Sequence, residues 1–181
     1  MQLKDYIPHV KEKYRKIFFS GINFDSSKVK KNNIFFAIKG NKFDGNNFIS
    51  NAINKGSKII VTEKKVNHVQ NGILYIHTKN IRKLLAETAF KIYNKKPKNL
   101  IAVTGTNGKS SIANFYFQIL KLNNKKVASI GTLGVKSKNI NLNLSNTTID
   151  PIKLAEILSK LKSHKIENVI MEASSHGLKQ N

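Results

Sequence analysis

Residues 100–111 read Leu100-Ile-Ala-Val-Thr-Gly105-Thr-Asn-Gly108-Lys109-Ser110-Ser111, and they decide the fold of the region around them. The first five residues are a short, mostly apolar run of the kind that forms a buried strand. The residues from Ser110 to Leu122 carry apolar side chains at helical spacing. A strand that enters a helix through a glycine-containing loop is the context of a phosphate-binding loop, or P-loop, and it predicts an α/β domain.

The residue types in this loop suit the binding of a phosphate group. Gly105 and Gly108 allow backbone amides to turn inward, and the start of the helix adds a partial positive charge. Lys109 is expected to reach the β- and γ-phosphates of a nucleotide, and the Ser110 hydroxyl group to bind Mg²⁺. The common form of the loop has a glycine six positions before the lysine, where this chain has Val103. The loop therefore follows a shorter variant, G-T-N-G-K-[ST].

Polar residues follow the other two strands predicted in this half of the chain, 127–130 and 168–172. Ligands of an open parallel sheet bind beyond the carboxyl ends of its strands, so we expect these residues to gather near the P-loop. Glu172 is then a second magnesium ligand, and Ser174 and His176 face a substrate or a phosphate. The residues of this group are Gly131, Thr132, Asn146, Thr147, Thr148, Glu172, Ser174 and His176.

The segment 94–99, Asn-Lys-Lys-Pro-Lys-Asn, separates two predicted domains. Pro97 disfavours a helix at Lys96, and the charges favour solvent. We expect a small α/β domain over 1–97 and a parallel-sheet P-loop domain over 98–181, incomplete because no helix follows its last strand. The first domain is predicted to have strands 34–38, 58–62 and 73–76 and helices 47–55 and 79–93. The second is predicted to have strands 100–104, 127–130 and 168–172, helices 110–122 and 151–164, and a loop or weak hairpin over 136–146.

The net charge of +22 is weak support for a nucleic-acid partner. The 181 residues include 30 Lys but only 2 Arg, together with 23 Asn and 23 Ile, a mixture that AT-rich codons produce without selection for a partner. Readers of phosphates and bases usually enrich arginine. The lack of cysteine excludes a disulfide scaffold and a thiolate zinc site. Without an apolar membrane span or a secretory signal, we expect a cytoplasmic protein with no membrane association and no specific nucleic-acid partner.

Taken together, these motifs resemble those of the Mur ligases. The shorter P-loop marks one group of ligases, and the Glu-x-Ser-Ser-His pattern at 172–176 resembles the Mur ligases that add the third peptide residue. Ser27 and Ile149 depart from the family, which usually has arginine and proline there. The matching segments are 24–29 (Phe-Asp-Ser-Ser-Lys-Val), 33–40 (Asn-Ile-Phe-Phe-Ala-Ile-Lys-Gly), 43–45 (Phe-Asp-Gly), 105–111, 146–148 and 171–180.

The resemblance implies a role for each matching residue. ATP is bound by Gly105, Thr106, Asn107, Gly108, Lys109, Ser110 and Ser111. The uridine part of a nucleotide substrate is contacted by Phe24 and Ser26, with Asn41, Lys42 and Phe43 on a neighbouring loop. The muramoyl-peptide part is held by Asn146, Thr147, Thr148, Ser174 and Gln180. Magnesium is bound by Ser110 and Glu172, and the catalytic residues are Lys109, Glu172 and His176.

The same resemblance implies an ATP-dependent amide ligase of peptidoglycan precursor synthesis. It adds diaminopimelate or lysine to UDP-MurNAc-L-Ala-D-Glu through an acyl phosphate, as a monomer, with ATP and Mg²⁺. The family's amino-acid-binding domain has no match in this chain, so we expect an N-terminal portion that is inactive alone. Three alternatives stay open: a ligase similar to folylpolyglutamate synthase, a basic P-loop protein that binds nucleic acid, and a non-catalytic fragment that binds a UDP-sugar.

Overall fold

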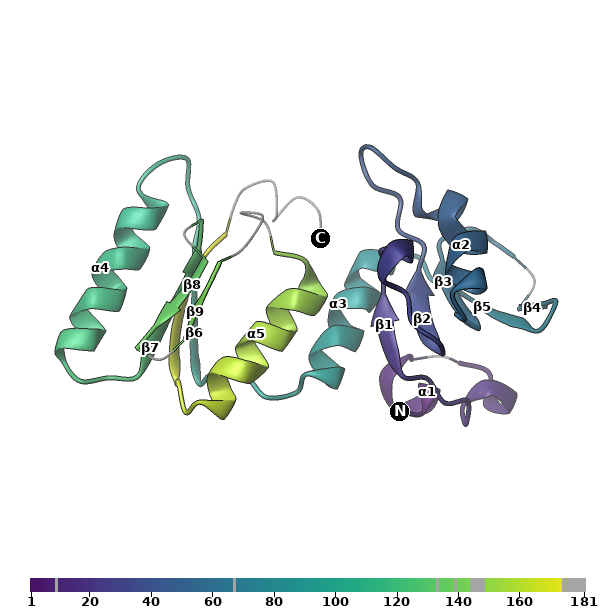
Figure 1. The fold of residues 1–181 in the computed structure, drawn as a ribbon, viewed down its shortest axis with the longest axis horizontal. Helices are drawn as coiled ribbons and strands as arrows, with labels where there is room; N and C mark the ends of the chain where they lie inside the picture. Colours follow the sequence, from purple (N-terminus) through teal and green to yellow (C-terminus); the bar gives the residue numbers. More distant parts are fainter. Residues whose placement is uncertain (9, 67, 133, 139, 144–148, 174–181) are drawn as a thin grey trace. The chain divides into compact units, whose positions relative to one another are not determined.

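The computed structural model describes residues 1–8, 10–66, 68–132, 134–138, 140–143 and 149–173. The chain divides into two compact units, Met1–Ile92 and Tyr93–Asn181. Within the described residues, each unit is built on one five-stranded sheet with helices against it, so the predicted α/β class is confirmed (Figure 1). The boundary expected between residues 97 and 98 lies in the segment that joins α3 (Ile81–Ile92) to β6 (Asn99–Val103), and it stays a prediction.

The sheet of the first unit has the strand order β1-β2-β3-β5-β4. Four strands run parallel: β1 (Gly21–Asn23), β2 (Asn33–Phe36), β3 (Ile59–Thr62) and β5 (Ile73–His77). The short β4 (Val69–Gln70) pairs antiparallel with β5. The other elements are α1 (Leu3–Tyr6), α2 (Ile49–Asn54), α3 and the 3₁₀ turns η1 (Glu12–Tyr14), η2 (Ser26–Lys28) and η3 (Gly45–Phe48). Every residue of β2 and β3 is buried, as in parallel strands that are covered on both faces.

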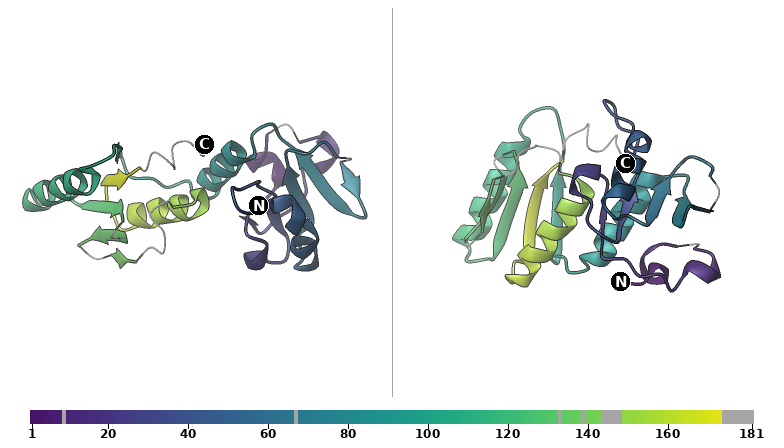
Figure 2. Two further views of the ribbon diagram at one scale, coloured as in Figure 1. Left: turned by 90° about the horizontal axis from the view of Figure 1, so that it is seen from above. Right: turned by 45° about the vertical axis from the view of Figure 1, so that its right-hand side comes forward.

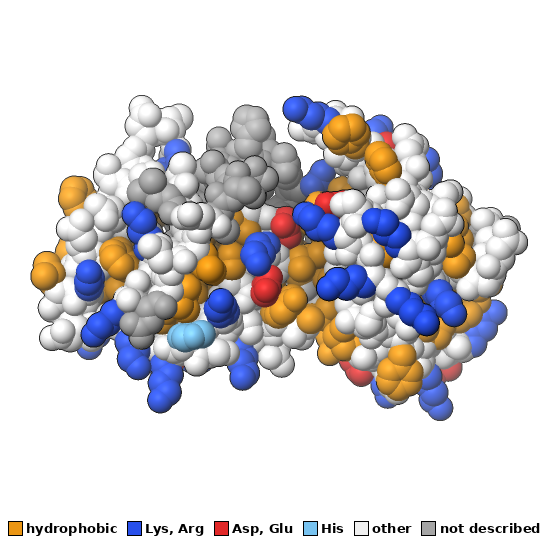
Figure 3. Space-filling model, in the orientation of Figure 1, with side chains coloured by type: hydrophobic (Ala, Val, Ile, Leu, Met, Phe, Trp, Pro, Cys, Tyr) orange, Lys and Arg blue, Asp and Glu red, His pale blue; other side chains and the backbone are white. Residues whose placement is uncertain are grey.

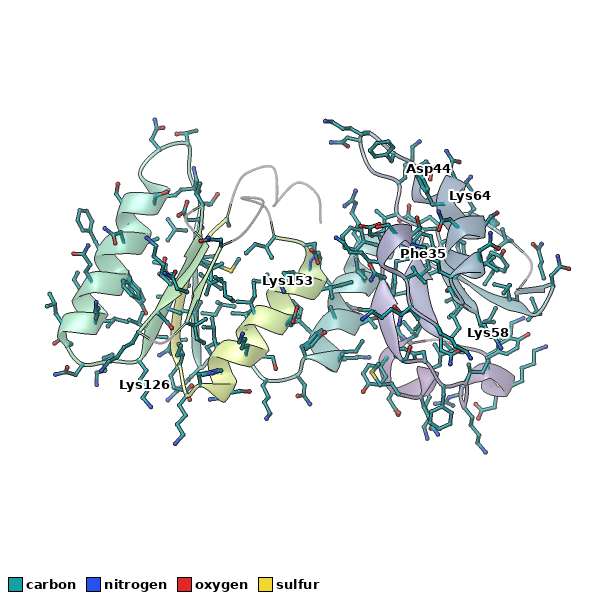
Figure 4. All side chains as sticks on the ribbon, in the orientation of Figure 1. Phe35, Asp44, Lys58, Lys64, Lys126 and Lys153 are labelled. Atoms are coloured by element: carbon teal, nitrogen blue, oxygen red, sulfur yellow. The ribbon has the colours of Figure 1, made fainter. Side chains whose placement is uncertain are left out.

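The core of this unit forms where α2 packs on the sheet. Phe35 and Ile60 are register partners on β2 and β3, and neither is exposed to solvent. Figure 4 shows Phe35 inside the unit and the exposed Lys58 at its surface. The side chains that pack around this pair are Val29, Ala37, Ile49, Ala52, Ile53, Ile73 and Tyr75. Burial of these apolar groups holds the loops that follow β1 and β2 on a rigid base.

The sheet of the second unit has the order β6-β10-β7-β8-β9. β6, β10 (Asn168–Glu172) and β7 (Val127–Gly131) run parallel, and β10 lies between β6 and β7. α4 (Lys109–Leu122) and α5 (Pro151–Ser163) cover opposite faces of this sheet (Figures 1 and 2). The predicted start of α5 is confirmed, because Asp150 accepts a hydrogen bond from the Lys153 amide (2.9 Å) and Pro151 is the first helical residue.

The second sheet is mixed rather than wholly parallel, which differs from the expectation. β8 (Gly134–Ser137) pairs antiparallel with β7, and β9 (Asn141–Leu142) pairs antiparallel with β8. Gly131 and Gly134 are register partners at the end of the β7–β8 pair, and Gly134 has a φ of +90°, a value that favours glycine. The sequence predicts a loop or weak hairpin over 136–146, and the antiparallel pairing of β8 with β9 agrees with the hairpin. The pairing of β8 with β7 is not predicted.

The surface combines scattered lysines with apolar side chains on two elements of the second unit. Figure 3 shows lysine and arginine side chains spread over the visible face of both units. On β6, Leu100 and Ile101 are 44% and 39% exposed. On α4, the exposed apolar residues are Ile112, Phe115, Ile119 and Leu122. Of the helices in the described residues, none has the length and apolar character needed to cross a membrane.

Glu167 ties α5 to the start of β6, and this contact predicts a pH-dependent stability. Its carboxylate accepts hydrogen bonds from Lys162 Nζ (2.6 Å) and the Lys98 amide (3.2 Å). The hydrogen bond from Lys162 lowers the pKa of Glu167 below its ordinary value of 4.5. The contribution to stability is therefore full above pH 4.5 and is lost as the pH falls through the lowered folded-state pKa. We expect Glu167→Gln to lower the melting temperature at pH 7, with the deficit narrowing below pH 4.5.

Circular dichroism melts of both proteins across this pH range measure the effect. Glu156→Gln is the control, because Glu156 pairs with Lys153 on the exposed side of α5 (3.0 Å). An equal, pH-independent effect of the two substitutions would contradict the role given to Glu167.

Candidate functional site

The segment between β6 and α4 has the local geometry of a phosphate-binding loop. Gly108 precedes the first residue of α4, and its φ of +78° favours glycine. The residues from Thr104 to Gly108 are exposed. Among the described residues, none accepts a hydrogen bond from the backbone amides of residues 105–111. Amides of this kind at the start of a 14-residue helix attract anions, because the helix dipole adds to their own partial charges.

Lys109 places its ammonium group over this loop. Its Nζ donates to the Gly105 carbonyl oxygen (2.6 Å) and to the Thr106 carbonyl oxygen (3.2 Å). The side chain therefore folds back from the helix toward the loop that precedes it. A phosphate bound by the loop amides meets this cation directly, as the sequence pattern predicts.

Ser110 and Glu172 bring two oxygen ligands together next to the loop. The Ser110 hydroxyl donates to Glu172 Oε2 (2.8 Å). Glu172 ends β10 and is the register partner of Val103, the last residue of β6. Mg²⁺ is commonly held by one or two protein oxygens together with substrate phosphates, and this pair fits that donor set. The described residues contain no cluster of three or more His, Cys, Asp or Glu side chains that could hold a metal by themselves.

This pair of residues lies at the wall of a cleft in the second unit. The cleft has a volume of about 950 Å³ and runs between α4 and the strands β7 and β8. Ser110, Ser111, Gly131, Lys136 and Glu172 are among its lining residues. Its size is in the range of small-molecule sites, so the oxygen pair faces a space that a ligand can enter.

The first unit presents two predicted substrate-binding segments at one edge of its sheet. Phe24 and Ser26 follow β1, and Asn41, Lys42 and Phe43 follow β2. Because β1 and β2 are parallel neighbours, both segments leave the same edge (Figure 1).

Asp25 holds the first of these segments in place. Its Oδ1 accepts hydrogen bonds from the Ser27 amide (2.9 Å) and the Ser27 hydroxyl (2.7 Å). The hydrogen bond from the Ser27 hydroxyl lowers the pKa of Asp25 below its usual range. Asp25 therefore carries a negative charge that caps η2.

The second segment is a narrow, exposed turn. Lys39 and Asp44 form a β-bridge, and the Gly40 amide donates to the Phe43 carbonyl oxygen (2.8 Å). Phe43 at the tip is 71% exposed, and its ring lies edge-on to that of Phe48 with centroids 6.4 Å apart. A nucleotide base can stack on an exposed aromatic ring of this kind, and lysines beside it can offset the charge of a phosphate.

Several predicted site residues lie outside the described residues. They are Asn146, Thr147, Thr148, Ser174, His176 and Gln180. Their roles in holding the muramoyl-peptide and in catalysis stay predictions, as do the substrate and cofactor roles of the residues described above.

Thr132 is a member of the site that received no individual role from the sequence. Its hydroxyl donates to Glu172 Oε2 at 3.3 Å. Sequence reasoning placed Thr132 and Glu172 at the same sheet edge, but their contact depends on β10 lying beside β7. Strand order of this kind is set by tertiary packing, and no local motif around Thr132 shows it.

A P-loop at the edge of a largely parallel sheet, with a hydrogen-bonded serine and glutamate beside it, is the arrangement of a nucleotide-binding α/β protein. Two family models match the chain: "Mur ligase family, catalytic domain" over residues 19–102 and "Mur ligase middle domain" over residues 103–181. The chain belongs to the Mur ligase family.

The relatives of this chain include a named ligase. This chain is 42% identical over 177 residues to the UDP-N-acetylmuramoyl-L-alanyl-D-glutamate–2,6-diaminopimelate ligase of Rickettsia conorii. The match covers 95% of this chain and 36% of that relative. A solved structure of a ligase with the same name matches 99% of this chain with a TM-score of 0.82 and 25% identity. The match covers 37% of that protein. The chain thus spans about a third of the length of these relatives.

A second solved structure shares the fold. It is the MurF ligase of Thermotoga maritima in complex with ADP, with a TM-score of 0.53 and 24% identity. The match covers 85% of this chain and 32% of that protein. At this identity the match bears on the fold alone, which agrees with the α/β architecture of both units.

Proposed function

We propose that this chain supplies the ATP site and the nucleotide-substrate site of an amide ligase in peptidoglycan precursor synthesis. The reaction adds diaminopimelate to UDP-MurNAc-L-Ala-D-Glu in the cytoplasm, and it serves cell-wall growth and division. The convergence of Lys109, Ser110 and Glu172 on one sheet edge carries the proposal. The 42% identity to a relative named for this reaction supports the choice of substrate class.

The proposed reaction has two steps that need positioning and charge neutralisation more than covalent help from the protein. A carboxylate oxygen of the nucleotide substrate attacks the γ-phosphorus of ATP, the bond to the bridging oxygen breaks, and ADP leaves. The amine nitrogen of the amino acid then attacks the acyl carbon of this acyl phosphate and displaces inorganic phosphate. The loop amides and Lys109 bind the triphosphate and offset the charge on its transferring group.

The Ser110 hydroxyl and the Glu172 carboxylate are the residues that would hold Mg²⁺. A bound magnesium ion supplies further neutralisation of the phosphate charge. The 2.8 Å separation of Ser110 Oγ and Glu172 Oε2 supports this assignment, because it places both oxygens on one side of the loop.

The first unit is proposed to bind the uridine nucleotide end of the substrate. Phe24 and Phe43 present aromatic surface at the edge where β1 and β2 end, and Lys42 adds a cation. The place of both rings after neighbouring parallel strands, Phe24 after β1 and Phe43 after β2, supports a binding role, because ligands of parallel sheets bind at the carboxyl ends of the strands.

Lys109→Ala tests the ATP site. We expect it to weaken ATP binding to the 181-residue chain by about 100-fold or more, because it removes the cation over the loop. Isothermal titration calorimetry measures the dissociation constant. Lys160→Ala is the control, since Lys160 is an exposed lysine near the end of α5 that does not line the cleft. Equal losses for both variants would show that general positive charge, and not the loop, attracts the nucleotide.

Phe43→Ala tests the nucleotide-substrate site. We expect it to weaken the binding of UDP-MurNAc-L-Ala-D-Glu by about 1–3 kcal/mol, the usual cost of losing one stacked ring. Binding of ATP should stay unchanged. Phe18→Ala is the control, because Phe18 is a similarly exposed ring (67%) of the same unit with no predicted role. If Lys109→Ala and Phe43→Ala each abolished the binding of both ligands, the assignment of one site to each unit would be wrong.

The salt dependence of binding separates this proposal from the nucleic-acid alternative. For a protein that binds DNA through its +22 charge, the logarithm of the binding constant falls steeply and linearly with the logarithm of the salt concentration. DNA affinity that remained high at physiological salt, without UDP-MurNAc-dipeptide binding, would favour that alternative.

A further inference from the structure

We propose that Gly131 and Thr132 are positioning residues that hold the Glu172 carboxylate at the nucleotide site. Gly131 provides the space in which the Glu172 side chain lies, and Thr132 fixes the carboxylate by a hydrogen bond. The proposal rests on the proposed function in one respect, which is the role of Glu172 as a magnesium ligand.

Gly131 lies directly beneath the Glu172 side chain. A Cβ atom added at Gly131 would lie 2.6 Å from Glu172 Cδ and 2.9 Å from Glu172 Cγ, and it would also overlap Oε1. Real Cβ atoms essentially never approach other heavy atoms this closely, so any side chain at position 131 displaces the carboxylate. Both residues are the last of their strands, and Gly131 is buried while Glu172 is half-buried.

The backbone at Gly131 does not itself demand glycine. Gly131 is a strand residue of β7, and it is not among the glycines of the described chain that have a positive φ. An alanine can adopt this backbone conformation without strain. The obstacle to a larger residue at this position is therefore the Glu172 side chain, which would have to move aside.

Thr132 contacts the same carboxylate oxygen as Ser110. Glu172 Oε2 accepts a hydrogen bond from Ser110 on α4 (2.8 Å) and one from Thr132 on the β7–β8 turn (3.3 Å). Because the Ser110 hydroxyl is proposed to bind the metal, Thr132 is the partner whose hydroxyl group is left to hold the Glu172 carboxylate. Hydrogen bonds of this kind orient metal-binding carboxylates and tune their affinity.

The strand order explains why these residues meet. Met171 on β10 is the register partner of Ile130 on β7, so Glu172 comes next to Gly131. Thr132 directly follows Gly131, and its hydroxyl contacts the carboxylate at the end of β10. The hairpin that makes the sheet mixed is thus the element that supplies the second support for Glu172.

Gly131→Ala is the first test. We expect the affinity of the chain for ADP in the presence of Mg²⁺ to fall by about 10- to 100-fold, the usual range for loss of a residue that orients a metal ligand. ADP affinity measured in EDTA should change little. Thermal unfolding shows whether the variant folds. In a Glu172→Ala background the same Gly131→Ala change should have no further effect, because the side chain that it displaces is gone.

Thr132→Val and Thr132→Ser form the second pair of variants. We expect Thr132→Val to weaken the magnesium-dependent part of ADP binding and Thr132→Ser to restore it, because serine keeps the hydroxyl group. This pair decides the proposal even if Gly131→Ala does not fold. Equal affinities for the valine and serine variants, or a Gly131→Ala loss that persists in the Glu172→Ala background, would overturn it.

A ligand-free measurement separates this proposal from the proposed function. The NMR signals of the Glu172 side chain should shift in Gly131→Ala and Thr132→Val without nucleotide or metal. If wild-type ADP binding does not respond to Mg²⁺ but these signals shift, the magnesium role of Glu172 is wrong and the positioning is right. If the signals do not shift, Gly131 and Thr132 do not position Glu172.

Discussion

The pairing of β10 between β6 and β7 is the constraint on which the candidate site depends. β6 leads into the P-loop, β7 leads into the turn with Thr132, and β10 delivers Glu172 between them. Any other strand order would separate the carboxylate from Ser110 or from Thr132. The pairing also joins distant parts of the chain, since Glu172 and Ser110 are 62 positions apart in sequence. A few backbone hydrogen bonds between strands therefore determine the position of a charged group that no local motif could place.

The two units present their candidate groups in the same way, at the carboxyl ends of parallel strands. In the first unit, a buried β2 and β3 hold a loop whose polar and aromatic residues are exposed. In the second, the loop of glycines and a lysine follows β6, which pairs with β10, where Val169 and Ile170 are buried. Within each unit, buried strands thus contribute stability, and the exposed loops that follow strands carry the candidate binding groups. The lysine-rich surface contributes charge over both units, but at the P-loop it is Lys109 that contacts the loop itself.

Local patterns predicted most helices and strands, because hydrophobic periodicity and caps act over short distances. The start of α5 at Asp150 and Pro151 and the P-loop before α4 are examples. The sequence does not predict the short edge strands β1 and β4. β1 has three residues and β4 has two, which is too few to show an alternation of apolar and polar side chains. In the candidate site, the sequence singles out Lys109, Ser110 and Glu172, because each lies at the end of a predicted strand or in the loop and helix that follow one. The contacts among Gly131, Thr132 and Glu172 were not, since they arise from strand order and from the space beside one glycine.

The exposed side of β6 has a consequence for how the protein behaves in solution. In the described residues β6 is an edge strand, and edge strands offer unpaired backbone groups to other chains. Leu100 and Ile101 give this strand exposed apolar surface, and Phe115 on α4 is exposed as well. A net charge of +22 opposes the approach of a second copy, but at 0.1 M salt charges more than about 10 Å apart are largely screened. Colloidal stability of the chain therefore falls as salt rises, which is opposite to the effect of salt on binding to a polyanion.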